Sequence, residues 1–547
     1  MITTKDWTPA DNLTLEPSAM TVVKSIEGCY ALIAGPGAGK TEMLAQRADF
    51  LLRTQTCRYP KRILAISFKT DASSNLRDRV IKRCGHELAT RFDSFTFHAF
   101  AKKIIDRFRP ILTGLDALDS DYKIGEARVH RKQITFGDLV PFAISILESS
   151  DMVRNIIKNT YTDVFLDEFQ DCTNLQYKLI QLAFLGTNAR IVSVGDNKQR
   201  IMGWAGALEG IFKAYADDFS ATPLRLYLNF RSKPRLLRLQ NEIIRVLEPE
   251  SVMPDGSFDG EEGKILIESF KNTQAEAAFV ASRIQNWLEV EHVPAYEIAI
   301  LISKQVDLYA HCLMDELNRL NISFRNEQQL QDLSSEPITR LLVDFLLCIY
   351  GEHEPKSWIK LHEKIAIFDD IDQSSVTLKV SRYIQKESKS YRQSNDYSNW
   401  WENIRFLLKT LRAKRLITLS PSYESIDYLK QLVLKFKQEL ESILSLEVDL
   451  IEALIRFSGD NAIRLLTIHK SKGLEFDSVI MMAIEKEIFF GKERDERCAF
   501  FVGVSRAKRQ LLLTHTDSRS CPNNYSGRWN INRTPYDEFL NYCRLVQ

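Results

Sequence analysis

Residues 29–41 read CYALIAGPGAGKT, an apolar run followed by a glycine-rich loop that ends in Gly-Lys-Thr. The run predicts a buried strand, and the apolar spacing of residues 43–52 predicts a helix directly after the loop. Glycines let backbone N–H groups approach phosphate oxygens, and the N-terminus of a helix favours negative charge. This strand–loop–helix arrangement is typical of a P-loop and predicts a nucleotide-phosphate site on an α/β fold.

The residues of the loop suggest separate roles at that site. We expect the backbone of Gly35, Gly37 and Gly39 to surround the phosphates. Lys40 can reach the β- and γ-phosphates, and the Thr41 hydroxyl can ligate Mg²⁺. The expected cofactors are therefore ATP and Mg²⁺. A fortuitous glycine-rich turn, the alternative, would not also require the strand, the lysine and the threonine.

The composition is that of an ordinary globular chain, with 547 residues, 44% hydrophobic, 27% charged and a net charge of +1. It excludes a disordered, collagen-like or coiled-coil chain. Because the charge is balanced, a nucleic-acid site must be a local basic patch. Nine cysteines without CxxC spacing argue against a zinc or iron–sulfur site, and with no visible signal peptide they favour a cytoplasmic location. The most apolar stretch, residues 341–350, is short and broken by Asp344, so we expect no membrane span.

Short apolar runs alternate with helical patterns along the chain, which predicts parallel sheets. They form two sets: 63–68, 163–166 and 191–194, then 224–228, 298–302, 463–468, 479–482 and 510–514. We expect two α/β lobes: a first at 1–225 with a helical insertion at about 100–160, and a second at 226–336 and 456–547 with a helical insertion at 337–455. Polar residues 386–399 predict an exposed loop within the larger insertion.

Residues 164–168, VFLDE, form a predicted strand that ends in two carboxylates. A strand ending in Asp167 can deliver that carboxylate to Mg²⁺ beside the P-loop. The adjacent Glu168 can orient and deprotonate a water, which suits hydrolysis. A solvated acidic strand end is the alternative, and the preceding P-loop makes it less favoured.

Three further polar residues lie near predicted strands. Residues 197–200 resemble a guanine-reading NKxD motif, but the fourth residue is Arg200, so we interpret Gln199 as a sensor of the γ-phosphate or its water. Arg231 and Arg506 could stabilise charge that develops on a transferring phosphate. Taken alone, each is more commonly a surface residue or a surface ion pair.

Seven blocks of sequence, in this order, resemble the motifs of superfamily 1 helicases of the UvrD/Rep type. They are ILAISFKTDA (63–72), TFHAF (96–100), LDEFQD (166–171), GDNKQRIMGWAGA (195–207), LYLNFRS (226–232), TIHKSKGLEF (467–476) and FVGVSRAK (501–508). The resemblance implies two RecA-like P-loop NTPase lobes with helical insertions and ATP in the cleft between them.

The resemblance also implies roles around the nucleotide. Arg231 and Arg506 would be arginine fingers, and Glu475 would hold the ribose. Arg47 and Phe230 would sandwich the adenine.

On the DNA side, the resemblance implies that Phe68 and Trp204 stack on bases of single-stranded DNA. Thr96 and His98 would contact its backbone. Stacking is tolerant of sequence and suits a motor. The alternatives are core aromatic residues for Phe68 and Trp204, and a structural histidine for His98.

Two residues depart from the family pattern. The arginine usual after the tryptophan of 195–207 is Ala205, so the coupling of nucleotide state to DNA is in doubt. The usual glutamine upstream of the P-loop falls on Ala19, so adenine selection is in doubt as well.

The function we expect is ATP-driven translocation, 3′ to 5′, on single-stranded DNA or DNA with a single-stranded tail, with strand separation. The alternative is a DNA-sensing ATPase subunit that reports DNA ends to a partner nuclease, for example in anti-phage defence, without unwinding by itself. A P-loop kinase would need neither Glu168 nor the arginines of the second lobe.

Overall fold

The computed structural model describes residues 2–68, 70–125, 127–201, 206–327, 333–334, 336–352, 354–366, 373–416, 419, 426–445, 448–459, 461–522 and 525–546. The chain forms two compact units, each with its own six-stranded sheet. The first unit comprises Met1–Gly263 and Gly491–Ser505. The second comprises Lys264–Phe490 and Arg506–Leu545. This confirms the predicted α/β fold class with parallel sheets.

The sheet of the first unit is parallel throughout, in the order β3-β2-β6-β7-β1-β8. Its strands are β1 (Tyr30–Ala34), β2 (Arg62–Ser67), β3 (Phe92–Thr96), β6 (Tyr161–Leu166), β7 (Arg190–Gly195) and β8 (Thr222–Leu226). Most of their residues are buried, as expected of a parallel sheet covered on both faces. Because the strands are parallel, the loops that follow β1, β2, β6 and β7 leave from one edge of the sheet.

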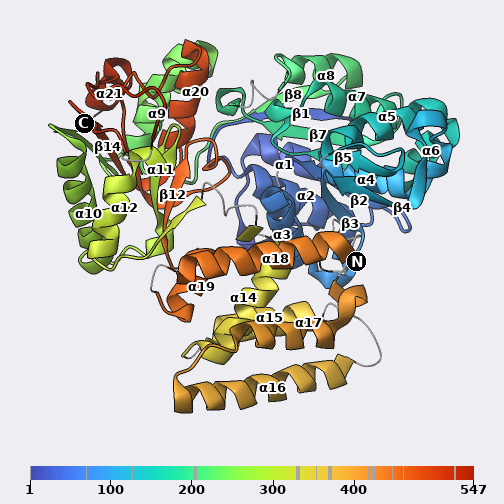
Figure 1. Cartoon of the computed structure of the whole chain (residues 1–547). Helices are drawn as coiled ribbons and strands as arrows, with labels where there is room; N and C mark the ends of the chain where they lie inside the picture. The colour runs from blue at the N-terminus through green and yellow to red at the C-terminus, as the bar shows by residue number, and fades with distance from the viewer. Residues whose placement is uncertain are drawn as a thin grey trace. The chain divides into compact units, whose positions relative to one another are not determined.

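Helices cover both faces of this sheet (Figure 1). Successive strand residues point to opposite faces, so in β1 Leu32 joins one core and Ala31 the other. The Leu32 side is covered by α1 (Pro17–Lys24), α2 (Lys40–Arg53) and α3 (Thr70–Ala89). The Ala31 side is covered by α4 (Phe97–Phe108), α5 (Leu139–Ser149), α6 (Asp151–Thr160), α7 (Asn174–Phe184) and α8 (Ile211–Phe219).

The insertion predicted to be helical at about 100–160 is only partly helical. Between α4 and α5 the strands β4 (Leu118–Gly125) and β5 (Arg131–Thr135) pair as a small separate sheet. Asp119 of β4 forms ion pairs with Arg131 at 2.7 Å and Lys132 at 3.0 Å. In β4 the apolar residues Leu118, Tyr122 and Ile124 alternate with Asp119, Asp121 and Lys123, a period-two pattern that the expectation of a helical insertion did not take into account.

The boundary predicted at residue 225 also differs from the structure, which keeps residues up to Gly263 in the first unit. The run at 224–228, expected in the second lobe, overlaps β8 of the first sheet. After β8, α9 (Pro234–Leu247) packs on α20 (Glu493–Val504), which also belongs to the first unit. Since α20 returns from far along the chain, the sequence pattern alone does not reveal this packing.

The second unit has a parallel sheet in the order β11-β12-β10-β13-β14-β9. Its strands are β9 (Lys264–Phe270), β10 (Ile298–Ile302), β11 (Phe324–Asn326), β12 (Ile463–Thr467), β13 (Phe476–Met481) and β14 (Ala507–Thr516). The helices α10 (Thr273–Glu289) and α12 (His311–Arg319) pack against each other in this unit.

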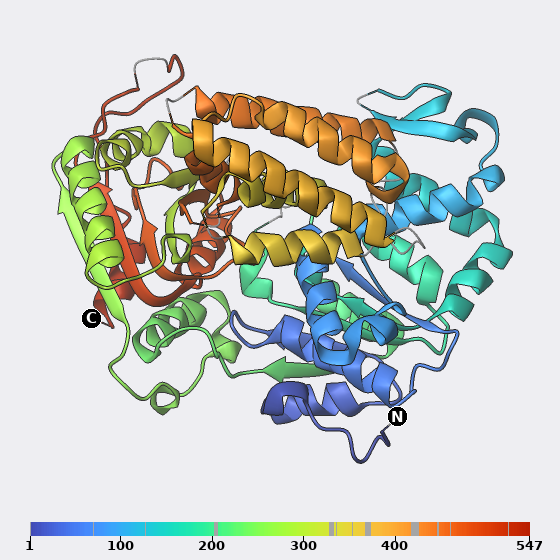
Figure 2. The same cartoon turned by 90° about the horizontal axis from the view of Figure 1, so that it is seen from below.

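The predicted helical insertion at 337–455 is a bundle with its own apolar core. Its helices are α14 (Pro337–Tyr350), α15 (Pro355–Ala366), α16 (Gln373–Ser394), α17 (Trp400–Leu416), α18 (Ile426–Leu444) and α19 (Leu450–Ser458). They lie side by side in Figures 1 and 2. The exposed loop predicted at 386–399 is wrong over 386–394, because α16 continues to Ser394 with its polar residues on an exposed helix face.

No helix within the described ranges is both long and apolar enough to cross a membrane.

A buried ion network supports the second sheet at the ends of β13 and β14. Arg519 lies 2.7 Å from Glu276 and 2.8 Å from Glu485, and all three side chains are almost completely buried. Glu485 also accepts hydrogen bonds from the backbone and hydroxyl of Thr516. The network therefore joins α10, the end of β14 and the segment that follows it.

We expect Glu485→Ala to lower the free energy of unfolding by about 1–3 kcal/mol, because buried donors of Arg519 and Thr516 lose their acceptor while Glu276 still pairs with Arg519. The shift of the urea midpoint measures this. Glu289→Ala, at an exposed residue of α10, is the control and should shift the midpoint little. Equal shifts for the two variants would mean that the buried network does not stabilise the unit.

Candidate active site

The predicted P-loop connects β1 to α2 at the carboxyl edge of the first sheet. Gly37 and Gly39 have φ values of 72° and 74°, a region that favours glycine. A Cβ atom at Gly37 would also collide with the side chain of Asn229. The backbone N–H of Phe230 donates to the Gly37 carbonyl at 3.0 Å, so residues 229–231 pack directly on the loop.

Lys40 begins α2, and its partly buried side chain folds back onto the loop. It donates to the carbonyl oxygens of Ala34 at 3.0 Å and Gly35 at 3.1 Å. Burial lowers the pKa of Lys40, and the nearby carboxylates of Glu168, Asp196 and Asp167 oppose that shift. The structure thus brings Lys40 together with the carboxylates that follow β6 and β7.

The two carboxylates after β6 differ in environment. Asp167 is almost completely buried, and its Oδ1 accepts the backbone N–H of Glu168 at 2.9 Å. Glu168 has a left-handed backbone with φ of 51°, and its Oε2 accepts a hydrogen bond from Gln170 Nε2 at 2.6 Å. Gln170 Oε1 accepts the backbone N–H of Asp196 at 3.0 Å.

Gln170 therefore joins the loop after β6 to the loop after β7. It is fully buried, and a Cβ at Gly195 would collide with it. The sequence analysis did not single out Gln170, although it lies within the LDEFQD block. Its position two residues after Glu168 in that block could have indicated a partner for the Glu168 carboxylate.

Gln199 lies in the short helix after β7 and is buried beside Asp196. Its Nε2 donates to Asp196 Oδ2 at 2.9 Å. Arg231 lies in the same region, because its positive charge contributes to lowering the pKa of Lys40. Its guanidinium donates a hydrogen bond to the Ser505 carbonyl at 3.1 Å. Asn229 Oδ1 accepts the backbone N–H of Arg231 at 2.8 Å and fixes the turn.

Thr41 and Asp167 carry the oxygen ligands that Mg²⁺ prefers, and both lie at the carboxyl edge of this sheet. Among the described residues, no cluster of three or more His, Cys, Asp or Glu side chains could hold a metal. This donor set fits Mg²⁺, which is typically bound by one or two protein ligands and the substrate phosphates.

The two residues predicted to sandwich adenine have very different positions. Phe230 is 65% exposed beside the P-loop, and its ring is available for stacking. Arg47 is fully buried; it donates to the carbonyls of Val22 and Ser25 and lies 3.9 Å from Asp163. The adenine role for Arg47 is therefore corrected, because its guanidinium faces the interior of the unit and fastens α1 to α2.

Glu475 and Arg506 belong to the second unit. Arg506 is buried and donates to the Leu474 carbonyl at 3.0 Å, and its own carbonyl accepts the backbone N–H of Phe476 at 2.9 Å. Glu475 is partly exposed, with Lys508 at 3.4 Å. Their roles toward a nucleotide stay predictions.

Of the predicted DNA residues, Phe68, Thr96 and His98 lie at the same edge of the first sheet as the P-loop. Phe68 follows β2 and is half-buried, and Thr96 ends the neighbouring β3. Thr96 caps α4 by accepting the backbone N–H of Ala99 at 3.2 Å. Trp204 and Ala205 lie outside the described residues.

His98 stacks on Phe136, with ring centroids 4.1 Å apart, and burial lowers the pKa of His98. Phe136 is 58% exposed. The sequence analysis missed Phe136, because it lies in the insertion and no pattern connects it to His98.

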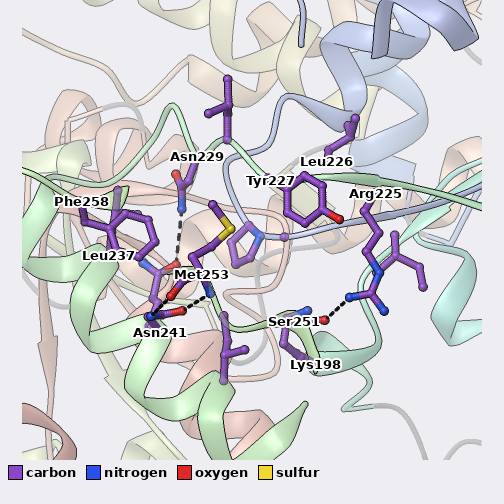
Figure 3. A pocket seen from close by; sticks show the side chains of 16 residues that line it. Lys198, Arg225, Leu226, Tyr227, Asn229, Leu237, Asn241, Ser251, Met253 and Phe258 are labelled. Atoms are coloured by element: carbon purple, nitrogen blue, oxygen red, sulfur yellow. Dashed lines mark hydrogen bonds between the residues drawn. The ribbon is translucent and has the colours of Figure 1, made fainter. Parts of the chain in front are cut away.

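A pocket adjoins the P-loop on the side of α9 (Figure 3). It is lined by Gly35, Lys198, Asn229 and Asn241, among others. Arg225 donates to Ser251 Oγ at 2.6 Å on its wall. The loop after β7 and α9 thus lie close together behind the P-loop.

Two family descriptions match most of the chain. The UvrD/REP helicase N-terminal domain matches residues 15–124 and 121–220, and the UvrD-like helicase C-terminal domain matches residues 224–405 and 371–518. Among similar proteins, DNA helicase II of Escherichia coli is 23% identical over 89% of this chain and 82% of its own. The ATP-dependent DNA helicase PcrA of Bacillus subtilis is 24% identical over 96% of this chain and 85% of its own. A probable DNA helicase II homolog of Mycoplasma genitalium is 23% identical, over 89% and 83%.

We expect Glu168→Gln to lower the kcat of ATP hydrolysis about 10²–10⁴-fold with little change in KM, because the amide cannot accept a proton from water. Steady-state hydrolysis measures both constants. Glu148→Gln, at an exposed residue of α5, should behave as the unchanged protein. Near-normal turnover of Glu168→Gln would remove Glu168 from the role of base.

We expect weak discrimination between ATP and GTP. Ala19 is buried within α1 and offers no amide to the base edge, and an exposed ring such as that of Phe230 can stack on any purine. A bidentate amide–adenine pair is worth about 1–3 kcal/mol of discrimination, or roughly 10–100-fold. The ratio of kcat/KM for the two nucleotides measures this. A preference for ATP above about 100-fold would show that another group reads the base.

Proposed function

The chain belongs to the UvrD-like helicase family, and from this membership and the site on its first unit we propose that it translocates on single-stranded DNA, 3′ to 5′, and separates strands. The membership gives an ATP-dependent DNA helicase with two RecA-like lobes. The polarity and the single-stranded substrate are our proposal.

The observation that carries the proposal is the convergence of charged groups at one edge of the first sheet. Lys40, Arg231 and the adjacent pair Asp167 and Glu168 come from three separate loops, and their full or partial burial makes each charge matter more than it would in water. This arrangement supports hydrolysis of a phosphoanhydride, since it combines a phosphate-binding cation with a carboxylate base.

The protein residues divide the chemistry between them. Lys40 and the loop N–H groups bind the phosphates, and Thr41 with Asp167 would hold Mg²⁺, which neutralises phosphate charge when bound. Glu168, oriented by Gln170, would accept the proton of the attacking water. Arg231 would stabilise charge on the γ-phosphate in the transition state.

Single-stranded DNA would lie along the aromatic residues at the same edge. Phe68 and the exposed Phe136, which stacks on His98, offer π faces that accept any base. We also propose that Trp204 stacks on a base, from its place in the block at 195–207. Thr96 caps α4, and its hydroxyl can still donate a hydrogen bond to the sugar–phosphate backbone of the DNA strand.

The test is strand displacement by the purified protein on duplexes with a 3′ tail, a 5′ tail or no tail. We expect ATP-dependent unwinding of the 3′-tailed duplex only, and hydrolysis of ATP that single-stranded DNA stimulates. The Glu168→Gln variant is the control for a contaminating helicase. Stimulated hydrolysis without unwinding of any duplex would instead favour the DNA-sensing ATPase subunit, and unwinding of the 5′-tailed duplex would reverse the polarity.

A further inference from the structure

Lys198 lies in the loop after β7, and its ammonium group is buried between two carboxylates. Nζ is 3.0 Å from Asp196 Oδ1 and 2.7 Å from Glu248 Oε2. Only 6% of the Lys198 side chain is exposed, and the Asp196 side chain is fully buried. A buried charge is costly unless it is paired, and here two carboxylates pair with the Lys198 ammonium group.

Asp196 is the link between Lys198 and the nucleotide site. Its carboxylate accepts Gln199 Nε2 at 2.9 Å, and its backbone N–H donates to Gln170 Oε1 at 3.0 Å. Asp196 is also among the three carboxylates whose charge acts on Lys40, with Asp167 and Glu168. It therefore adds a negative charge close to where a γ-phosphate would lie.

The negative charge of Asp196 explains why the nucleotide site needs Lys198 in addition to Lys40. A nucleotide triphosphate brings further negative charge into a site of low dielectric constant, where repulsion from an unpaired carboxylate is strong. Burial alone would raise the pKa of Asp196, but Lys198 and Lys40 bring it below its ordinary value. Burial alone would lower the pKa of Lys198, but Asp196 and Glu248 raise it above its ordinary value. Both groups are thus charged at neutral pH.

We propose that Lys198 is a positioning residue of the nucleotide site, which neutralises Asp196 so that the charge of Lys40 is available to the γ-phosphate. The inference rests on the proposed ATPase function of the first unit. A purely structural role is the competing explanation, because Glu248 follows the end of α9 and the Lys198–Glu248 pair could simply hold that helix.

The experiment compares the equilibrium binding of AMPPNP, which carries a γ-phosphate, with that of ADP, which does not. In Lys198→Met the affinity for AMPPNP should fall about 10–100-fold, the range expected for one uncompensated charge near a phosphate. The affinity for ADP should change less than about 3-fold, a difference under 1 kcal/mol. Lys213→Met, at an exposed residue of α8, is the matched control.

Second-site variants separate the two explanations. Asp196→Asn added to Lys198→Met should restore AMPPNP binding, whereas Glu248→Gln added to Lys198→Met should not. The single variant Asp196→Asn should bind AMPPNP at least as tightly as the unchanged protein, and it tests the charge argument even if Lys198→Met does not fold.

Three results would overturn the proposal: rescue by Glu248→Gln alone, equal losses for AMPPNP and ADP, or an Asp196→Asn variant that loses AMPPNP as strongly as Lys198→Met. Failure of the ATPase function on which the inference rests is seen separately, because the unchanged protein would then not hydrolyse ATP; failure of strand separation alone is seen in the displacement assay and does not affect the binding comparison.

Discussion

The burial of the Lys40 ammonium group is the constraint on which the site depends. Its charge is removed from water, and the carboxylates of Asp167, Glu168 and Asp196 compensate for that loss. These carboxylates follow β6 and β7; β7 lies next to β1 in the sheet, and β6 lies next to β7. The strand order therefore has an electrostatic consequence: it delivers the negative charges to the one edge where the P-loop buries a positive charge.

This dependence explains why so much of the site could be predicted from the sequence. A buried parallel strand is an uninterrupted apolar run, and polar residues directly after it must lie at the carboxyl edge of the sheet. That logic places Lys40, Asp167, Glu168 and Gln199 correctly in the first unit without any knowledge of helix packing. The comparisons add the family, which the order of the sequence blocks had already implied.

The errors come from features that only tertiary packing decides. Arg47 lies on a regular helix, and periodicity does not show that its guanidinium turns inward to the carbonyls of Val22 and Ser25. The end of the first unit at Gly263 depends on α20, which returns from more than 200 residues later to pack on α9. The β4–β5 pair was missed for a different reason: the period-two signal of β4 is confined to one short stretch, and its partner β5 is recognised only once the two strands are paired.

In the second unit, hydrogen bonds of the backbone, instead of ion pairs between side chains, hold the predicted site residues in place. The Leu474 carbonyl accepts a hydrogen bond from the guanidinium of Arg506, and the Phe476 N–H donates to the Arg506 carbonyl. The residues on both sides of Glu475 are therefore hydrogen-bonded to Arg506. β13 begins directly after Glu475 and β14 begins directly after Arg506, and the two strands pair in the sheet. Glu475 and Arg506 are therefore rigidly connected, and any movement of this edge of the second sheet must carry both residues together.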